Sequence, residues 1–319
     1  MSKLRQLKYS ASDAASILLE TYANKSAVRR QYIDANQLQK LAITLGRDLN
    51  GIDVSEQPPA LGTPVPHGYH LAYFTPNGTE SDLGADGTDR TFNASSPFTR
   101  RMWAGGKMTW ANERLRVGDE VEERTRLLSA IPKKSRSAGE MVLVEVEKEF
   151  WGPRGLTLTD RRSWVFRPEI DQQAMEETSK PKASENVIRG PSLVRDLDTK
   201  SQGFPVRELQ WSPVGLFRFS ALTFNGHMIH YNDPWSERVE GHPGLVVHGP
   251  LNLINLLNYW RDVHGKDPQG ITYRAMSPVY AGETYNIQTA GVRETDNRKT
   301  WDVNVEKEGV VCMKSEITA

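Results

Sequence analysis

Histidines are concentrated in one part of this 319-residue sequence. Five of the seven lie between His227 and His264, and an apolar run interrupted only by asparagines follows from Leu251 to Trp260. The unperturbed pKa of histidine is about 6.5, so either protonation form exists near neutral pH. An apolar run of this kind after Gly249 and Pro250 is typical of a buried helix, since proline suits the first helical turn. The pattern therefore predicts acid–base chemistry beside a buried helix.

Two segments around these histidines resemble a known family. They comprise residues 217–231 and 240–251. Both are similar to the MaoC-type hydratase/dehydratase family, in its branch of hydroxyacyl-thioester dehydratase type 2 and mesaconyl-CoA hydratase. Residues 100–106 and 115–119 resemble the N-terminal half of the same branch. The resemblance therefore spans residues 30–319 and implies a hydro-lyase that adds or removes water across the α,β bond of an acyl thioester.

The resemblance implies three catalytic residues. The family pairs an acidic or amide residue with a histidine five positions later, which corresponds to Asn225 and His230 here. Hydration and dehydration both require proton transfer, which a histidine performs and an amide does not, so His230 would carry the proton. The family assigns to the backbone N–H of Gly249 the stabilisation of the thioester oxygen, a role that suits the positive end of a helix.

Four further residues are predicted to bind the substrate: His248, Tyr231, Met228 and Arg101. His248 would line the pocket or orient the turn before the helix. In the resembling branch, the position of Met228 usually carries Arg or Lys and that of Asn232 usually carries Asp. These departures indicate either a different acyl substrate or a different chemistry. The basic clusters at 100–101 and 133–136 are either a solvated surface or an edge that contacts the phosphates of coenzyme A.

Metal and cofactor chemistry find little support in the sequence. The histidines lack neighbouring cysteines and the spacing of helical zinc ligands. There is no glycine-rich phosphate loop, dinucleotide motif or serine-hydrolase motif. We therefore expect no metal and no cofactor, with coenzyme A or an acyl carrier present only as part of the substrate.

Composition narrows the remaining classes of partner. Forty basic and forty acidic residues cancel, which gives no general attraction to nucleic acid, and no apolar run is long enough for a membrane span. The single cysteine excludes a disulfide framework and favours a reducing compartment. We expect an intracellular protein, cytoplasmic or mitochondrial. The first twelve residues, with Lys3, Arg5 and Lys8, are either a short presequence or a basic tail before an ordinary helix.

Two motifs occur twice, about half a chain apart. A Gly-acid turn leads into an alternating strand at Gly118 and again at Gly282, and a second strand follows at 144–149 and 303–308. The two offsets, 164 and 159 positions, differ by five, which a longer loop around 133–139 in the first copy would explain. The near-equal offsets predict an internal duplication.

The expected architecture is an α+β double hot-dog fold, in which two antiparallel sheets each wrap a helix. The predicted units are an extension at 1–29, an N-terminal scaffold domain at 30–168, a linker at 169–192 and a catalytic C-terminal domain at 193–319. Further predictions are a helix at 34–49 with Asp34 as its N-cap and a surface excursion at 76–96.

Two alternatives to the hydro-lyase remain open on the sequence alone. One is a hot-dog tailoring enzyme, an isomerase or cyclase, that acts on a substrate without a thioester. The other is a non-catalytic acyl-binding protein. The oligomeric state is expected to be a monomer or a homodimer.

Overall fold

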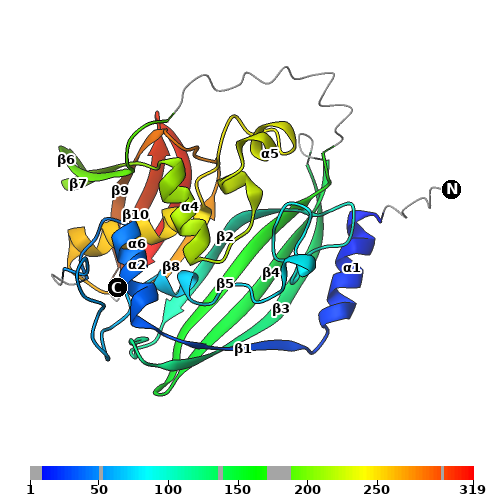
Figure 1. Ribbon diagram of the computed structural model, residues 1–319, viewed down its shortest axis with the longest axis horizontal. Coiled ribbons are helices and arrows are strands. Elements are labelled where there is room, and N and C mark those ends of the chain that lie inside the picture. The colour runs from blue at the N-terminus through cyan, green and yellow to red at the C-terminus, as the bar shows by residue number, and fades with distance from the viewer. Residues whose placement is uncertain (1–8, 50–52, 136–138, 171–187, 296–297) are drawn as a thin grey trace.

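A single antiparallel sheet of eleven strands dominates the computed structural model, which describes residues 9–49, 53–135, 139–170, 188–295 and 298–319 (Figure 1). The strand order is β1-β3-β4-β5-β2-β8-β11-β10-β9-β7-β6. The strands are β1 (Ser26–Tyr32), β2 (Arg100–Trp110), β3 (Glu120–Ser135), β4 (Gly139–Gly152), β5 (Gly155–Arg167), β6 (Leu193–Ser201), β7 (Phe204–Gln210), β8 (Gly270–Ala275), β9 (Thr284–Thr295), β10 (Arg298–Lys307) and β11 (Val310–Thr318).

The predicted duplication is visible in the strand order. The N-terminal half contributes β1-β3-β4-β5-β2, and the C-terminal half contributes β7-β9-β10-β11-β8 in the same relation, with β6 added at the edge. Strands β2 and β8 pair antiparallel from Gly105 with Arg274 to Thr109 with Gly270. The two predicted sheets are therefore one continuous sheet, joined where the two copies meet.

The difference of five residues between the copies has another cause than the one predicted. Lys133, Lys134 and Ser135 belong to β3 and pair with Met141, Glu140 and Gly139 of β4. Strand β3 is 16 residues long, and its counterpart β9 has 12. The prediction of a longer loop at 133–139 was therefore wrong for these residues, because the extra length extends the strands; residues 136–138 lie outside the described part of the chain.

The predicted buried helix is α6 (Gly249–His264), and every residue from Leu251 to Trp260 is buried. Pro250 stands in its first turn, and Gly265 ends it in the left-handed conformation. Trp260 packs edge-on against Trp301 of β10, with ring centroids 5.4 Å apart. The C-terminal half of the sheet thus wraps one long helix, as predicted.

The N-terminal half covers its inner face differently. The short 3-10 helix η1 (Tyr69–Ala72) places His70 against Phe150 of β4, with ring centroids 5.1 Å apart. Helix α1 (Ala11–Tyr22), which a Ser10 capping box begins, covers the far ends of β3 and β4. Within the described ranges, no helix of the length of α6 crosses this half.

Two further helices, one from each half of the chain, pack against each other. Helix α2 (Ala35–Thr44) has the predicted N-cap Asp34, whose carboxylate accepts from the Gln37 N–H at 2.8 Å, and it ends earlier than predicted. It packs against α4 (Pro213–Leu222), which Ser212 caps. The sequence interpretation did not predict α4, η2 (Glu80–Asp82), η3 (Met228–His230) or α5 (Asp233–Arg238).

The segment 76–96 is not the plain surface excursion that its composition predicted. Phe92 and Ala94 are buried in a second core under α1. The Met228 N–H donates to the Asp86 carbonyl at 2.9 Å, so the segment contacts the histidine-bearing loop. Its glycine-rich composition signals turns but does not reveal what those turns pack against.

The unit boundaries predicted from the sequence stay predictions. Most of the linker predicted at 169–192 lies outside the described residues, and the boundary predicted at residue 30 falls within β1. In the described part of the chain, no helix is both long and apolar enough to cross a membrane.

Candidate active site

A cavity of about 370 Å³ lies between the two halves. The C-terminal half lines it with the loop after α4 and the beginning of α6, and the N-terminal half lines it with strands and the 76–96 segment. Five of the seven predicted site residues belong to this lining: Asn225, His230, His248, Gly249 and Arg101.

Tyr231 and Met228 do not belong to the lining. The Tyr231 side chain is 41% exposed, and its hydroxyl donates to the Gly226 carbonyl at 2.9 Å. The Met228 sulfur lies 3.8 Å from the Asn232 side-chain nitrogen, and Asn232 caps α5. Both brace the loop from outside, because the 3-10 turn at 228–230 brings Ile229 and His230 into the lining and leaves Met228 out of it.

His230 is buried at the end of that turn, and its protonation is defined by one hydrogen bond. Its Nδ1 lies 2.7 Å from the Val246 carbonyl oxygen. A carbonyl only accepts, so Nδ1 carries the hydrogen and Nε2 of the neutral ring keeps a lone pair. Burial, together with the neighbouring His227 and His242 and against the hydrogen bond to the Val246 carbonyl, lowers the pKa of His230 to about 3. His230 is therefore a neutral imidazole whose Nε2 can take a proton.

Asn225 stands on the same loop, after the left-handed residue Phe224. Its side-chain oxygen accepts from the His227 N–H at 3.1 Å, which holds the turn. Its NH2 group makes no hydrogen bond to another described residue, and the residue lines the cavity. The amide can donate a hydrogen bond to a bound oxygen.

Gly249 is the first residue of α6, where a backbone N–H has no partner within the helix. Among the described residues no acceptor bonds this N–H. A Cβ at this position would meet Trp103 at 3.6 Å, which is ordinary contact. The N–H is therefore free for a ligand at the positive end of the helix.

His248 precedes Gly249, and its ring lies flat on that of His230, with centroids 3.6 Å apart and planes 18° apart. Its Nε2 lies 2.8 Å from the hydroxyl oxygen of Ser220 in α4. Burial lowers the pKa of His248 well below its usual value, and His230 and His227 lower it further. Sequence reasoning gave Ser220 no role, because the contact depends on how α4 packs.

Arg101 points into the cavity from β2, with its guanidinium 5.1 Å from the Trp164 ring centroid. Burial lowers its pKa, while the carboxylates of Asp89 and Asp86 raise it. Its neighbour Arg100 instead bonds the Glu240 carboxylate at 2.6 Å. Both arginines of this sequence cluster belong to the lining, but Arg100 is held in an ion pair with Glu240, while Arg101 lies over the Trp164 ring.

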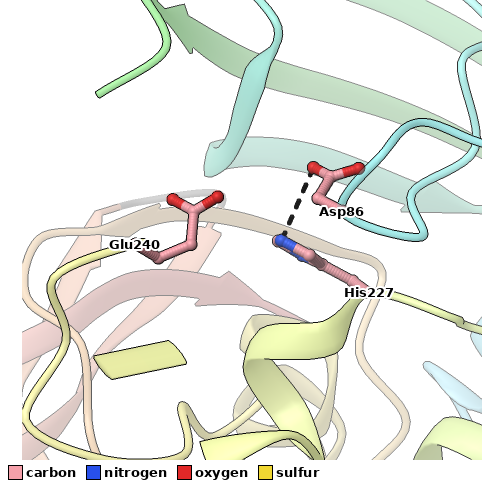
Figure 2. Close-up of side chains that lie close together, drawn as sticks. All are labelled: Asp86, His227 and Glu240. Carbon is pink, nitrogen blue, oxygen red and sulfur yellow. Dashed lines mark ion pairs between the residues drawn. The ribbon is translucent and has the colours of Figure 1, made fainter. Parts of the chain in front are cut away.

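The Asp86, His227 and Glu240 side chains converge above this region, with one possible ligand atom of each within 4.8 Å of the others (Figure 2). His227 Nε2 lies 3.8 Å from the Asp86 carboxylate. Burial, together with Arg101, His242 and Arg100, lowers the pKa of His227 to about 3. Glu240 is already bound by Arg100, and two guanidinium groups oppose a further cation. This geometry favours a contact between loops over a metal site.

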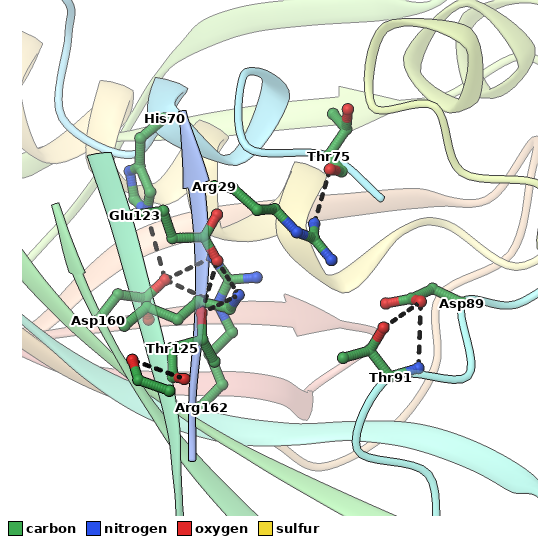
Figure 3. A network of polar contacts seen from close by, with 11 residues as sticks. Arg29, His70, Thr75, Asp89, Thr91, Glu123, Thr125, Asp160 and Arg162 are labelled. Atoms are coloured by element: carbon green, nitrogen blue, oxygen red, sulfur yellow. Dashed lines mark hydrogen bonds and ion pairs between the residues drawn. The ribbon is translucent and has the colours of Figure 1, made fainter. Parts of the chain in front are cut away.

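The N-terminal half contributes buried charges to the cavity. Lys148 and Arg162 both belong to the lining, and each is paired on the side away from it: Lys148 with Glu123, and Arg162 with Asp160 at 2.6 Å. Figure 3 shows how Glu123, Asp160 and His70 converge in this network. Burial by itself would raise the pKa of Asp160. The charge of Arg162 is the largest effect against burial, and the pKa is lowered to about 2. No sequence motif marks these residues, since they come from the strands β3, β4 and β5 and from the 3-10 helix η1.

A family model for hydroxyacyl-thioester dehydratase type 2 matches residues 68–281. The chain belongs to the hydroxyacyl-thioester dehydratase type 2 family. Mesaconyl-C(4)-CoA hydratase of Chloroflexus aurantiacus is 31% identical over 224 residues, which are 70% of this chain and 73% of the relative. Hydroxyacyl-thioester dehydratase type 2, mitochondrial, of Schizosaccharomyces pombe is 24% identical over 269 residues, or 82% and 88% of the two chains. The predicted family is confirmed.

Solved structures show the fold of this hydroxyacyl-thioester dehydratase type 2 family member. A MaoC-like dehydratase, 14% identical, superposes with a TM-score of 0.64 over 94% of this chain and 99% of its own. A Mycobacterium tuberculosis protein described as having a double hotdog fold, 11% identical, reaches 0.55 over 98% of both chains. The predicted double hot-dog fold is confirmed, with the two sheets joined into one.

Proposed function

We propose that His230 is the proton-transferring residue of this chain, a hydro-lyase that acts on acyl thioesters. The single observation that carries the assignment is the hydrogen bond from His230 Nδ1 to the Val246 carbonyl at 2.7 Å, which leaves Nε2 as a base in the cavity. The family and the named hydratase and dehydratase relatives support hydro-lyase chemistry.

In the hydration direction, one proton passes through His230. A water molecule adds its oxygen to the β-carbon of the enoyl thioester, and Nε2 of His230 takes a proton from that water. The electron pair of the double bond moves to the α-carbon and the thioester oxygen as an enolate. The imidazolium then returns its proton to the α-carbon. Dehydration is the same sequence in reverse and consumes no other reagent.

Gly249 and Asn225 stabilise and orient in this mechanism. The free N–H of Gly249, at the positive end of α6, donates to the thioester oxygen as it gains negative charge. The NH2 group of Asn225 donates to the attacking water or the departing hydroxyl. Because an amide does not readily exchange protons, His230 serves both proton-transfer steps alone.

We propose that the substrate is a small acyl thioester carried by coenzyme A. Coenzyme A carries the acyl group, as in the mesaconyl-C(4)-CoA of the named relative. Arg101 and His248 contact the acyl part of the substrate. The acyl part extends along the strands of the N-terminal half, where no described helix as long as α6 covers the sheet. We propose that neither cofactor nor metal takes part. We further propose an intracellular protein, mitochondrial like the fission-yeast relative or cytoplasmic, as a monomer or homodimer.

The structure weakens the reason for expecting a different chemistry from the residues at 228 and 232. Met228 and Asn232, which differ from the branch, contact each other and do not belong to the cavity lining. They brace the loop that carries His230, so their substitution changes the support of the site and leaves its lining intact.

The test is turnover of a panel of 2-enoyl-CoAs and 3-hydroxyacyl-CoAs by the wild-type chain, His230→Gln and His264→Gln. His264 is a matched control, since it packs between Phe204 and Trp260 away from the lining. Loss of the acid–base residue lowers kcat by about 10²- to 10⁴-fold in His230→Gln. Wild-type kcat in that variant would refute the role of His230. A folded wild-type chain inactive on the whole panel would favour the tailoring-enzyme alternative.

A further inference from the structure

The placement of His248 is unusual for a residue that only precedes a helix. It occupies the N-cap position of α6, yet its side chain makes no capping hydrogen bond. Ser, Thr, Asp and Asn are preferred there because they bond the free N–H groups of the first turn. Its Nδ1 is buried and has no hydrogen-bond partner in the described residues. Helix formation therefore does not explain this histidine.

The contacts that His248 does make all fix the plane of its ring. The ring is 1% exposed, and Ser220 holds Nε2 at 2.8 Å. The ring of Phe219 meets it edge-on, with centroids 4.9 Å apart. One face of the ring lies on the ring of His230, with centroids 3.6 Å apart. Two side chains of α4 therefore hold an aromatic face against the base.

The proposed reaction requires that a positive charge on His230 be stabilised in a buried site. While His230 carries the proton, it is an imidazolium ion in a buried site, and burial with His227 and His242 opposes that charge. Its Nδ1 faces a backbone carbonyl, where many histidine bases face a carboxylate. Arg100 and Arg101, which act on the neighbouring His227, carry the same sign as the imidazolium. The carboxylates of Asp86 and Glu240 lie beside His227, and Arg100 already binds Glu240. The face of an aromatic ring within about 6 Å attracts a cation.

We propose that His248 is a positioning residue for the reaction: its ring, held by Ser220 and Phe219, lies on His230 and stabilises the imidazolium that forms while His230 holds the transferred proton. This inference rests on the proposed function, since it requires that His230 be protonated during turnover. Ser220 then acts indirectly, by keeping the His248 ring parallel to the His230 ring.

Three substitutions of His248 separate the ring from the hydrogen bond. His248→Phe keeps a flat ring and loses the bond to Ser220, His248→Gln keeps a polar partner for Ser220 and loses the ring, and His248→Leu loses both. A cation–ring interaction of ordinary strength predicts a fall in kcat of about tenfold in the Gln and Leu variants and of less than about threefold in the Phe variant. The comparison uses kcat, because the imidazolium exists only after substrate has bound, whereas KM also reports the contact of residue 248 with the acyl part.

Ser220→Ala gives a gentler test that does not depend on the folding of the His248 variants. It frees the ring without removing it, and we expect kcat to fall by about threefold, the equivalent of one weak hydrogen bond. Ser315→Ala is its matched control, since Ser315 is equally buried, donates to the Val303 carbonyl at 2.8 Å and lies outside the cavity. That control should keep wild-type kcat.

The pH dependence of kcat/KM tests the mechanism apart from structure. Loss of the ring disfavours the imidazolium, so the acid limb of the His248→Leu profile should move to lower pH than that of His248→Phe. Equal kcat and equal acid limbs in the Phe and Leu variants, or wild-type kcat in the Gln variant, would overturn the proposal. Wild-type kcat in His230→Gln would instead refute the proposed function itself, so the two failures are distinguishable.

Discussion

Glu123 and Ile287 occupy the same place in the two halves of the molecule, five positions after the turn glycines Gly118 and Gly282. Ile287 in β9 is buried in the core that contains α6. Glu123 in β3 is buried to the same extent but forms an ion pair with Lys148. One position of a duplicated strand thus carries an apolar side chain in one half and a buried charge in the other.

The difference follows from what covers each inner face. In the C-terminal half α6 fills the concave side, so apolar side chains gain free energy by burial against it. In the N-terminal half, no described helix of that length fills the face, and the cavity reaches the strands. Charges that line such a space are stable only when paired, as Lys148 and Arg162 are. Under the proposed function, the C-terminal half supplies the reacting groups, and the N-terminal half supplies strands whose buried charges are paired.

After His230, the largest effect should come from the residue that begins α6. Gly249→Pro removes the N–H and keeps a backbone that suits the first helical position, so kcat should fall by about 10²- to 10³-fold, as for loss of one oxyanion donor. Gly249→Ala is the matched variant, since it keeps the N–H and its Cβ meets Trp103 at 3.6 Å. Steady-state hydration kinetics of both variants measure the difference. Equal kcat in the two would show that the N–H does not act on the thioester.

Making the N-terminal half more like the C-terminal half should destabilise it. Glu123→Ile copies the residue of β9 and leaves the buried Lys148 amine without its carboxylate, which should cost about 3–5 kcal/mol of unfolding free energy. Denaturant unfolding measures the loss. The residue is hidden from sequence reasoning because a strand with one buried acid looks like a solvated strand.

The double variant Glu123→Ile with Lys148→Met sharpens the comparison. Removing both charges replaces the pair by apolar groups, so most of the lost unfolding free energy should return, since such replacements are often neutral. Because Lys148 also lines the cavity, kcat/KM should still differ from wild type. A double variant as unstable as Glu123→Ile would show that the pair is not the source of the loss.

The sequence predicted features that local patterns encode and missed features that depend on how distant segments pack. Helix α6 and its proline start follow from a local pattern, the duplication is visible in the strand order, and His230 and Gly249 were predicted from the family resemblance. The network of Asp160, Arg162 and Lys148 depends on the register of the β4–β5 pair, which places Lys148 opposite Asp160. The stack of His248 on His230 depends in addition on how α4 packs, which no local spacing encodes.

The segment 76–96 links the halves, and Gly87 tests that link. A Cβ there would overlap with the Gly226 carbonyl oxygen beside Asn225, so Gly87→Ala should displace the reactive loop. Displacement of reacting groups predicts a fall in kcat of about ten- to a hundredfold. Gly62→Ala is the control: its φ of +82° resembles the +81° of Gly87, but nothing lies within 4 Å. If kcat is equal in the two variants, the overlap with the Gly226 carbonyl does not displace the reacting groups, and any fall in kcat comes from backbone strain alone.

The smallest effect concerns pH. Because burial holds the pKa of His230 at about 3, its ring is already neutral at mildly acidic pH. Between pH 7.5 and 5.5, kcat/KM should change by less than about twofold, whereas a base with the ordinary histidine pKa would lose about tenfold.

Stability should respond to the same range of pH with a defined sign. The unfolded histidine binds a proton near pH 6.5 and the folded one only near pH 3, so the unfolded state holds more protons between these values. The unfolding free energy is therefore highest above pH 6.5 and falls as the pH drops toward 3, by up to about 1.4 kcal/mol per pH unit for each such histidine. His227, with a pKa of about 3, adds to the same slope. Denaturant unfolding at pH 7.5 and 5.5 measures this loss, and a fall in kcat/KM at pH 5.5 without a matching loss of folded protein would contradict a neutral His230.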